Sequence, residues 1–242
     1  MELSKYFEIG KGTVPIVLSC PHGGYKKPKN IPDKAKGPNI ADKNTYLLAK
    51  MVIKALEEKN VKIFYIFNKI HRSKIDVNRP PLSIAAFEQS SNEARSIHHL
   101  YHDTLINFAL ECVELYGRAL VYDLHGFSKP HGDYPDIIFG HIFGKTLDLI
   151  ENPNETNCDK YWGCAQLQLE LSKLFSLDDG LGSNNYNIAY SGGYITHQFY
   201  NQANISAIQL EIAKYIRLDS SLMKQFANSF VKAILTSISN FI

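Results

Sequence analysis

The chain has 242 residues, of which 45% are hydrophobic and 21% are charged, and this balance excludes an intrinsically disordered protein. Its formal net charge of +2 is too small to favour nucleic acid or an anionic membrane surface as a partner. It has no apolar run near the roughly 20 residues of a transmembrane helix, and its N-terminus lacks the basic start and apolar block of a signal peptide. We therefore expect one cytoplasmic domain over residues 1–242, with its four cysteines reduced.

The first part of the chain predicts two strands and a helix. Residues 14–20 form a short apolar run that stops at Pro21, which is typical of a buried strand. The five lysines between positions 26 and 36 are separated by proline and glycine and predict a solvated surface loop. Apolar residues recur at helical spacing over residues 42–60, with Asp42 near the start, and residues 61–67 predict a second strand.

The rest of the chain continues this alternation. A long helix is predicted over residues 91–117, closed by Gly117, and strands are predicted at 118–123 and 136–140. Residues 144–157 carry the weakest pattern and predict a surface excursion. A helix at 162–175, a strand at 205–212 and a helix from residue 220 to the C-terminus complete the chain. Strands and helices in this order favour a mostly parallel sheet covered on both faces.

Polar side chains lie at or just beyond the ends of several predicted strands. His22 follows the first strand, Asp123 and His125 end the third, and Glu211 lies near the end of the last. Ligands of such sheets bind beyond the carboxyl ends of the strands, so these residues are expected to share one site. Two histidines suit zinc, which usually has a third protein ligand and an open position. Asp123 shares a strand face with His125 and could orient it, whereas a turn histidine bonded to backbone is the alternative for His22.

A glutamate and two arginines add a candidate base and an anion site. Glu211 sits among apolar strand residues, where an unpaired carboxylate is costly, so it is either an ion-pair partner or a general base near a metal. Arg72 and Arg79 flank residues 76–78, and guanidinium groups bind carboxylates bidentately, which favours an acidic substrate. The alternative is that Asp76 neutralises one arginine in a structural pair.

Two further segments are candidates for the lining of the site. His98 and His102 lie four residues apart on one face of the predicted long helix. That spacing can bind a metal, but a substrate-side or core role is favoured because no glutamate lies between them. Residues 191–196 contain two glycines followed by Tyr194 and predict a lid, a substrate-lining loop or a simple turn.

In order and number, these motifs resemble those of the N-formylglutamate amidohydrolase family. The matching pieces are residues 19–24, Asp42 with Thr45 and Leu48, Arg72 with residues 76–80, Tyr101-His102, residues 123–125, residues 192–196 and residues 209–212. They run from about residue 14 to residue 217, and the family is similar in turn to the zinc carboxypeptidases and aspartoacylase. The resemblance implies a phosphorylase/hydrolase-like α/β fold, a three-layer sandwich with a mixed, mainly parallel sheet between helices.

The resemblance also implies roles for individual residues. His22 and His125 match the first and last zinc ligands, and Glu211 matches the catalytic glutamate. Arg72 matches the arginine that polarises the scissile carbonyl. The residues expected to bind substrate are Asn78, Arg79, His102 and Tyr194, with the Asn78-Arg79 pair holding a carboxylate.

The chain departs from the wider group at the second metal ligand. The group has a glutamate three residues after the first histidine, where this chain has Tyr25. Asp42 is the replacement candidate, because it opens the first predicted helix and could reach the same strand end, and Glu88 is the runner-up. A second departure is Gly126-Phe127 after His125, where the amidohydrolases tend to have serine.

The expected function is a zinc-dependent amidohydrolase that cleaves the N-formyl or other N-acyl amide of an acidic amino acid. N-formyl-L-glutamate is the reference substrate, and this small molecule is the expected partner. One alternative is a related hydrolase of another N-acyl or peptide-like amide. Another is a non-catalytic anion-binding protein that has lost the metal. The metal content of the purified protein distinguishes this binding protein from a metal-dependent hydrolase.

Overall fold

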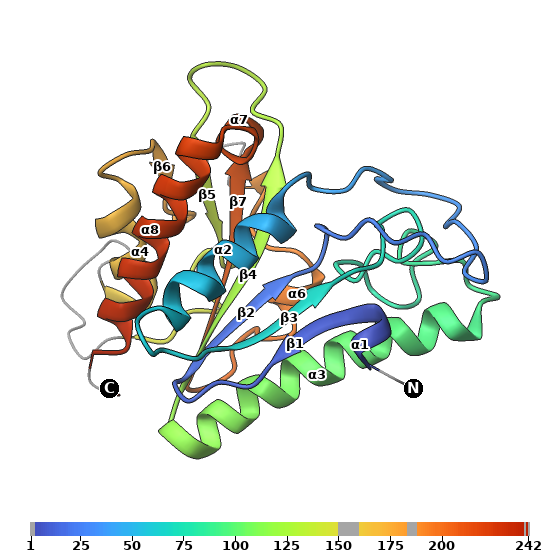
Figure 1. The fold of residues 1–242 in the computed structure, drawn as a ribbon, viewed down its shortest axis with the longest axis horizontal. Helices are drawn as coiled ribbons and strands as arrows, with labels where there is room; N and C mark the ends of the chain where they lie inside the picture. Colours follow the sequence, from blue (N-terminus) through green and yellow to red (C-terminus); the bar gives the residue numbers. More distant parts are fainter. Residues whose placement is uncertain (1–2, 150–159, 183–187, 240, 242) are drawn as a thin grey trace.

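The computed structural model describes residues 3–149, 160–182, 188–239 and 241. Within these residues, seven strands form one sheet in the order β1-β3-β2-β4-β7-β5-β6 (Figure 1). The strands are β1 (Phe7–Gly10), β2 (Ile16–Cys20), β3 (Phe64–Asn68), β4 (Ala119–Phe127), β5 (Ile137–Gly140), β6 (Leu177–Asp178) and β7 (Ile205–Ala213). The helices are α1 (Leu3–Tyr6), α2 (Thr45–Glu57), α3 (Asn92–Tyr116), α4 (Cys164–Leu171), α6 (Tyr194–His197), α7 (Lys214–Leu218) and α8 (Ser220–Ser237).

The centre of the sheet is parallel. β3, β2, β4 and β7 run in one direction, whereas β1 and β5 pair antiparallel with β3 and β7. All five predicted strands are present, and the mixed, mainly parallel sheet between helices confirms the predicted α/β class. β1 and the two-residue β6 were not predicted.

Different helices cover the two faces of the sheet. α3 packs against β2, β3 and β4 on one face, and α2 and α8 lie over the other, with α4 against α8 (Figure 1). Along β4, Tyr122 and Leu124 belong to the core beneath α2 and α8, while Val121 belongs to the core beneath α3. Because side chains alternate along a strand, Asp123 and His125 lie on the same face as Val121.

The long helix α3 confirms the prediction over residues 91–117. Ser91 caps its start, since the Ser91 hydroxyl accepts a hydrogen bond from the backbone N–H of Ala94 at 3.2 Å. Gly117 ends it in the left-handed conformation, with φ of 80°. None of the described helices is both long and apolar enough to cross a membrane.

The start of α2 differs from the prediction. The helix begins at Thr45, so Asp42 lies in the preceding loop and does not open the helix. The backbone N–H of Asp42 donates to the carbonyl of His22 at 3.0 Å, and the Asp42 carbonyl accepts the N–H of Thr45. These bonds tie the loop to the turn that follows β2.

Two loop expectations hold for most of the described residues, and each has a buried exception. Lys34, expected on a solvated loop, is buried; its Nζ donates to the carbonyl of Ala85 at 3.1 Å and lies 3.6 Å from Asp76 Oδ2. The Asp76 carboxylate offsets the cost of burying this ammonium. Within the predicted excursion, Thr146 is buried and its hydroxyl donates to the carbonyl of Ala207 at 2.7 Å. Positions 150–157 of that segment lie outside the described residues.

The cysteines follow the expectation only in part. Cys20 and Cys112 are buried free thiols. Cys164 is disulfide-bonded, so the expectation of four reduced cysteines is wrong. Cys158 lies outside the described residues. Spacing alone could not reveal this bond, because pairing depends on the distance between the two Cα atoms.

Candidate active site

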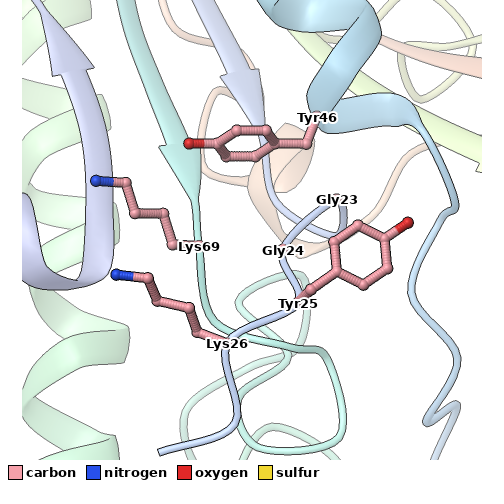
Figure 2. Close-up of a pocket in the computed structure, with 6 residues that line it drawn as sticks. All are labelled: Gly23, Gly24, Tyr25, Lys26, Tyr46 and Lys69. Carbon is pink, nitrogen blue, oxygen red and sulfur yellow. The ribbon is translucent and has the colours of Figure 1, made fainter.

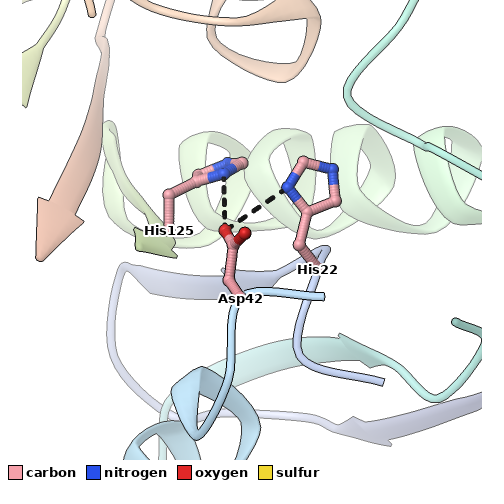
Figure 3. A group of neighbouring side chains, drawn as sticks. All are labelled: His22, Asp42 and His125. Atoms are coloured by element: carbon pink, nitrogen blue, oxygen red, sulfur yellow. Dashed lines mark ion pairs between the residues drawn. The ribbon is translucent and has the colours of Figure 1, made fainter. Parts of the chain in front are cut away.

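His22, Asp42 and His125 form a buried cluster at the carboxyl ends of β2 and β4 (Figure 3). Asp42 Oδ2 lies 3.5 Å from His22 Nδ1 and 3.7 Å from His125 Nδ1. One donor atom from each residue lies within 4.8 Å of the others, so the group could hold a metal ion. The runner-up ligand, Glu88, is elsewhere: its carboxylate accepts hydrogen bonds from Ser90.

Both imidazoles are held from behind by a second carboxylate. His22 Nε2 lies 2.7 Å from Asp76 Oδ1, and His125 Nε2 lies 2.7 Å from Asp123 Oδ2. An ionised carboxylate can only accept, so each ring donates its Nε2–H outward and turns Nδ1 toward Asp42. His22 Nδ1 is buried without a hydrogen-bond partner. This is the arrangement in which proteins orient metal-binding histidines.

Asp123 is itself held by a buried chain of hydroxyl groups. Ser19 on β2 donates to Asp123 Oδ1 at 2.6 Å, and the Ser19 hydroxyl lies 2.7 Å from that of Tyr101 on α3. Tyr101, Ser19, Asp123 and His125 therefore form a continuous path from the long helix to the cluster. Because each polar group in the path has a partner, the orientation of the His125 ring is fixed.

The charges in the cluster perturb its titration. Burial alone would raise the pKa of Asp42, but the neighbouring His125 and His22 outweigh burial and hold that pKa well below its usual range. Burial alone would lower the pKa of His125, yet Asp123 and Asp42 raise it to about 10. The carboxylates thus create a strongly negative environment that favours a cation at the cluster.

Asp76 organises the loop between β3 and α3. Its carboxylate accepts from Arg72 Nε at 2.8 Å and from the backbone N–H of Asn78 at 3.1 Å, in addition to His22. Burial alone would raise its pKa, but His22 and Arg72 hold it well below its usual range. Arg79 Nε lies 4.0 Å away, and 43% of the Arg79 side chain is exposed. Arg72 is therefore the arginine that Asp76 chiefly neutralises.

A cavity of about 410 Å³ opens in front of the cluster. The residues that line it are Asp42, Arg72, Asn78, Arg79, His125, Gly126, Phe127, Ser128, Ala189, Tyr190, Gly192, Gly193, Gln209 and Glu211. It thus joins two residues of the cluster to both arginines and the buried glutamate, as the sequence predicted for a shared site.

A second hollow lies beside the turn that follows His22 (Figure 2). Its lining is Gly23, Gly24, Tyr25, Lys26, Tyr46 and Lys69. The two ammonium groups are already hydrogen-bonded, Lys26 to the carbonyl of Lys5 and Lys69 to that of Ser4. This hollow has none of the titratable groups of the cluster.

Glu211 and His125 lie side by side on neighbouring strands. β4 and β7 pair in parallel with His125 opposite Glu211 and Asp123 opposite Gln209. Glu211 is 7% exposed, and burial raises its pKa, although the positive charge of His125 opposes that shift. Glu211 Oε1 accepts a hydrogen bond from Gln209 Nε2 at 2.9 Å, and Gln209 Oε1 accepts the N–H of Gly193 at 2.8 Å.

The glycine-rich turn before α6 packs on Asn78. Asn78 Oδ1 accepts the backbone N–H of Ile195 at 2.9 Å. A Cβ atom at position 193 would lie 2.1 Å from Asn78 Nδ2, so only glycine allows this approach. The amide of Asn78 therefore fixes the turn as well as lining the cavity.

Two residues expected to bind substrate are not among those described that line the cavity. The Nε2 of His102 bonds to the carbonyl of Val77 at 2.8 Å, and that of His98 bonds to the carbonyl of Arg79 at 2.9 Å. The ring of Tyr194 lies 5.0 Å from that of His102. The three rings thus pack beneath the loop that carries Asn78 and Arg79.

Several residues of the site were missed as functional from the sequence. Ser19, Tyr101 and Gln209 occur within the matching motifs, but nothing in their spacing shows which carboxylate each one contacts. Pairing of Asp76 with an arginine was the alternative interpretation of that segment, and the bond of Asp76 to His22 was not predicted. A polar residue inside an apolar strand, such as Ser19, could have indicated a buried hydrogen bond, because buried polar groups nearly always have a partner.

One family model matches the chain, and two solved structures share its fold. Residues 85–216, more than half of the chain, match the sequence model of N-formylglutamate amidohydrolase, a range that includes His125 and Glu211. The N-formylglutamate amidohydrolase of Ralstonia eutropha JMP134 superposes with a TM-score of 0.70 at 14% identity, covering 98% of this chain and 99% of that chain. A gene product of Agrobacterium tumefaciens superposes with a TM-score of 0.63 at 12% identity, covering 97% and 95%. No curated protein matches the sequence. The chain belongs to the N-formylglutamate amidohydrolase family and is a hydrolase of amide bonds.

Proposed function

We propose that this enzyme is a zinc-dependent amidohydrolase that removes the formyl group, or another small acyl group, from the nitrogen of an acidic amino acid. N-formyl-L-glutamate is the reference substrate. The observation that carries the proposal is the single cavity that brings a metal-competent cluster, a buried glutamate and a partly exposed arginine together.

His22, Asp42 and His125 are the residues that would hold zinc. Two imidazoles and one carboxylate make a donor set that zinc takes in catalytic sites, and both Nδ1 atoms already face Asp42. The buried, unpartnered Nδ1 of His22 supports this assignment. Zinc in such a site supplies Lewis-acid chemistry, because it makes water more acidic and polarises a carbonyl oxygen.

Glu211 is the proposed general base. Its carboxylate lines the cavity opposite His125, and its raised pKa brings it nearer to neutrality, where a base both accepts and returns a proton. Glu211 takes a proton from the attacking water and then delivers it to the nitrogen of the leaving amino acid. The hydrogen bond from Gln209 to Oε1 holds the carboxylate in place during both transfers.

The two arginines have different proposed roles. Arg72 is held by Asp76 and its Nη1 lies 3.5 Å from Asp42 Oδ1, so its charge is fixed beside the cluster. It is placed to stabilise the oxyanion that develops during attack. Arg79 is more exposed and lines the same cavity, so with Asn78 it is proposed to bind a substrate carboxylate.

The test combines metal analysis with a substrate series. The purified protein, reconstituted with zinc, should carry about one zinc per chain. It should hydrolyse N-formyl-L-glutamate faster than N-formyl-L-glutamine, which keeps the α-carboxylate but has an uncharged side chain. His125→Ala should lose most of the metal and the activity, whereas His131→Ala, an exposed control, should lose neither. Zinc-free wild-type protein would refute the metal part of the proposal. Zinc-free protein without turnover would favour the anion-binding alternative, whereas zinc binding with no turnover of any N-acyl amino acid would favour a hydrolase of another, peptide-like amide.

A further inference from the structure

Arg217 is a buried cation on α7 whose hydrogen bonds go to backbone carbonyls. It is 3% exposed. Its Nε donates to the carbonyl of Ile212 at 3.0 Å, its Nη2 donates to that of Phe127 at 3.1 Å, and its Nη1 donates to that of Lys43. A planar guanidinium can reach three acceptors in fixed directions, which a lysine ammonium cannot reproduce.

Each of these carbonyls lies next to a residue of the site in the sequence. Lys43 follows Asp42, Phe127 is two residues after His125, and Ile212 follows Glu211. One side chain therefore joins the loop before α2, the end of β4 and the end of β7. The turn after β2, which carries His22, is linked to these three segments as well, because the carbonyl of His22 accepts the N–H of Asp42.

The backbone at Gly126 adds an independent observation. A Cβ atom at this position would lie 2.2 Å from Arg217 Cζ, so the guanidinium occupies the space of a side chain at position 126. The N–H of Gly126 donates to Asp42 Oδ2 at 3.0 Å, the oxygen that faces both imidazoles. Arg217 therefore packs on the peptide group that orients Asp42.

We propose that Arg217 is a positioning residue that fixes the segments carrying Asp42, His125 and Glu211, and thereby sets the metal affinity of the cluster. The metal half of this proposal rests on the proposed function. The positioning half does not, because the three hydrogen bonds and the contact with Gly126 exist without any ligand.

The experiment uses the full chain with Arg217→Lys and Gly126→Ala, and Arg118→Lys as the matched control. Arg118 precedes the opposite end of β4, where it pairs with Asp148 and lies 4.4 Å above the Trp162 ring. Hydrogen exchange on metal-free protein should show faster exchange in peptides containing Asp42, Gly126 and Ala213 for both test variants. The control should leave these peptides unchanged. Zinc affinity, measured by competition with a chelator, should weaken roughly 10- to 100-fold in the test variants.

Unchanged exchange at Asp42 and Gly126 in Arg217→Lys would overturn the proposal, and so would wild-type zinc affinity in both test variants. If Arg217→Lys does not fold, Gly126→Ala decides, because its added methyl group displaces the guanidinium without removing it. If wild-type protein binds no zinc, the proposed function fails, while the exchange measurement still decides whether Arg217 positions the three segments.

Discussion

Asp42 and Glu211 are two buried carboxylates of the same cavity with opposite titration behaviour. Two imidazoles face Asp42 and hold its pKa low despite its burial, so it stays ionised. Burial dominates at Glu211 and raises its pKa. A permanently charged carboxylate suits a metal ligand, and one nearer to neutrality suits proton transfer. The environment of each residue thus supports the proposed division between ligand and base.

Glu211→Gln keeps the shape of the side chain but removes the proton acceptor. We expect kcat to fall by roughly 10²- to 10⁴-fold, the usual effect of losing general-base catalysis, while zinc content stays at the wild-type level. Steady-state kinetics and elemental analysis check this. Glu58→Gln, an exposed change at the end of α2, serves as the control. Near-normal turnover in Glu211→Gln would assign the base to another residue, with Asp123 the next candidate.

Arg79→Lys keeps a positive charge but loses the fork that binds a carboxylate through two nitrogens. The effect should fall mainly on KM for acidic N-acyl amino acids, because this contact exists in both the ground state and the transition state. A neutral amide analogue should be a poor substrate and nearly indifferent to the change. Equal turnover of the acid and the amide by wild type would contradict this role and would show that Asn78 and Arg79 are structural residues of the loop.

At the residue scale, the sequence predicted which types of residue gather at the cavity better than it predicted the contacts between their side chains. His22, His125 and Glu211 were predicted to share a site because each lies at or near the end of a predicted strand, where backbone direction determines position, and the structure does bring them close together. Asp42 was chosen over Glu88 and does lie with the histidines, although in a loop whose path no pattern encodes. The glycine at position 126, an apparent departure, has a physical reason, since Arg217 fills its place.

At the scale of elements, the predicted and observed ends of β4 differ for a clear reason. The apolar pattern stops at Asp123, but β4 continues to Phe127 because its backbone pairs with β7 as far as Ala213. Hydrogen bonding between strands does not depend on side-chain polarity, so hydrophobic patterning cannot detect it. β1 escaped prediction because it is a four-residue edge strand without a regular burial pattern.

The histidines of α3 make that helix sensitive to acid. Burial lowers the pKa of His98 to about 3 and that of His102 to about 4, from an ordinary value of 6.5. Between the lowered pKa of each folded histidine and the ordinary pKa of 6.5, the unfolded chain binds more protons than the folded one. The free energy of unfolding is therefore fully maintained above pH 6.5 and falls as the pH drops toward 4, by up to about 1.4 kcal/mol per pH unit for each histidine.

His98→Gln retains a donor near Nε2 for the carbonyl of Arg79 but does not titrate. Its free energy of unfolding should depend less steeply on pH between 6.5 and 4 than that of wild type. Urea denaturation at several pH values measures the slope. Leu110→Gln, an exposed change on the same helix, should leave the slope unchanged. An unaltered slope in His98→Gln would show that this histidine does not carry the effect.

At the scale of the whole molecule, the sheet order explains the place of the cavity. β2 lies between β3 and β4, so the chain leaves β2 for one neighbour and later returns to the other side. Parallel sheets bind ligands at such reversal points. The reversal point here lies between β2 and β4: His22 follows the end of β2, and His125 lies near the end of β4. The alternation of strands and helices predicted the class of the sheet, but the order of the strands depends on crossovers that the sequence pattern does not show.

Zinc should stabilise the folded molecule as a whole. The donors at positions 22, 42 and 125 meet only in the native structure, so a ligand of the cluster binds the folded state selectively. Zinc at 100 times its dissociation constant should add about 2.7 kcal/mol to the free energy of unfolding. Thermal unfolding with zinc and then with excess chelator measures this gain and its reversal. His125→Ala should show no comparable rise in Tm, and an equal rise there would place the binding elsewhere.

The register of β4 and β7 makes strand length a determinant of reactivity. Glu211 faces the cavity beside His125 only while its position differs by an even number from those of the cavity-facing residues earlier in β7, such as Gln209. A shift of one residue would direct Leu210 into the cavity and Glu211 into the apolar core that contains Phe226 and Phe230. A shift of two would restore the parity but displace the carboxylate by about 6.6 Å along the strand. The position of the carboxylate therefore depends on the exact register of β7, and the insertion or deletion of a single residue in this strand would move Glu211 out of the site.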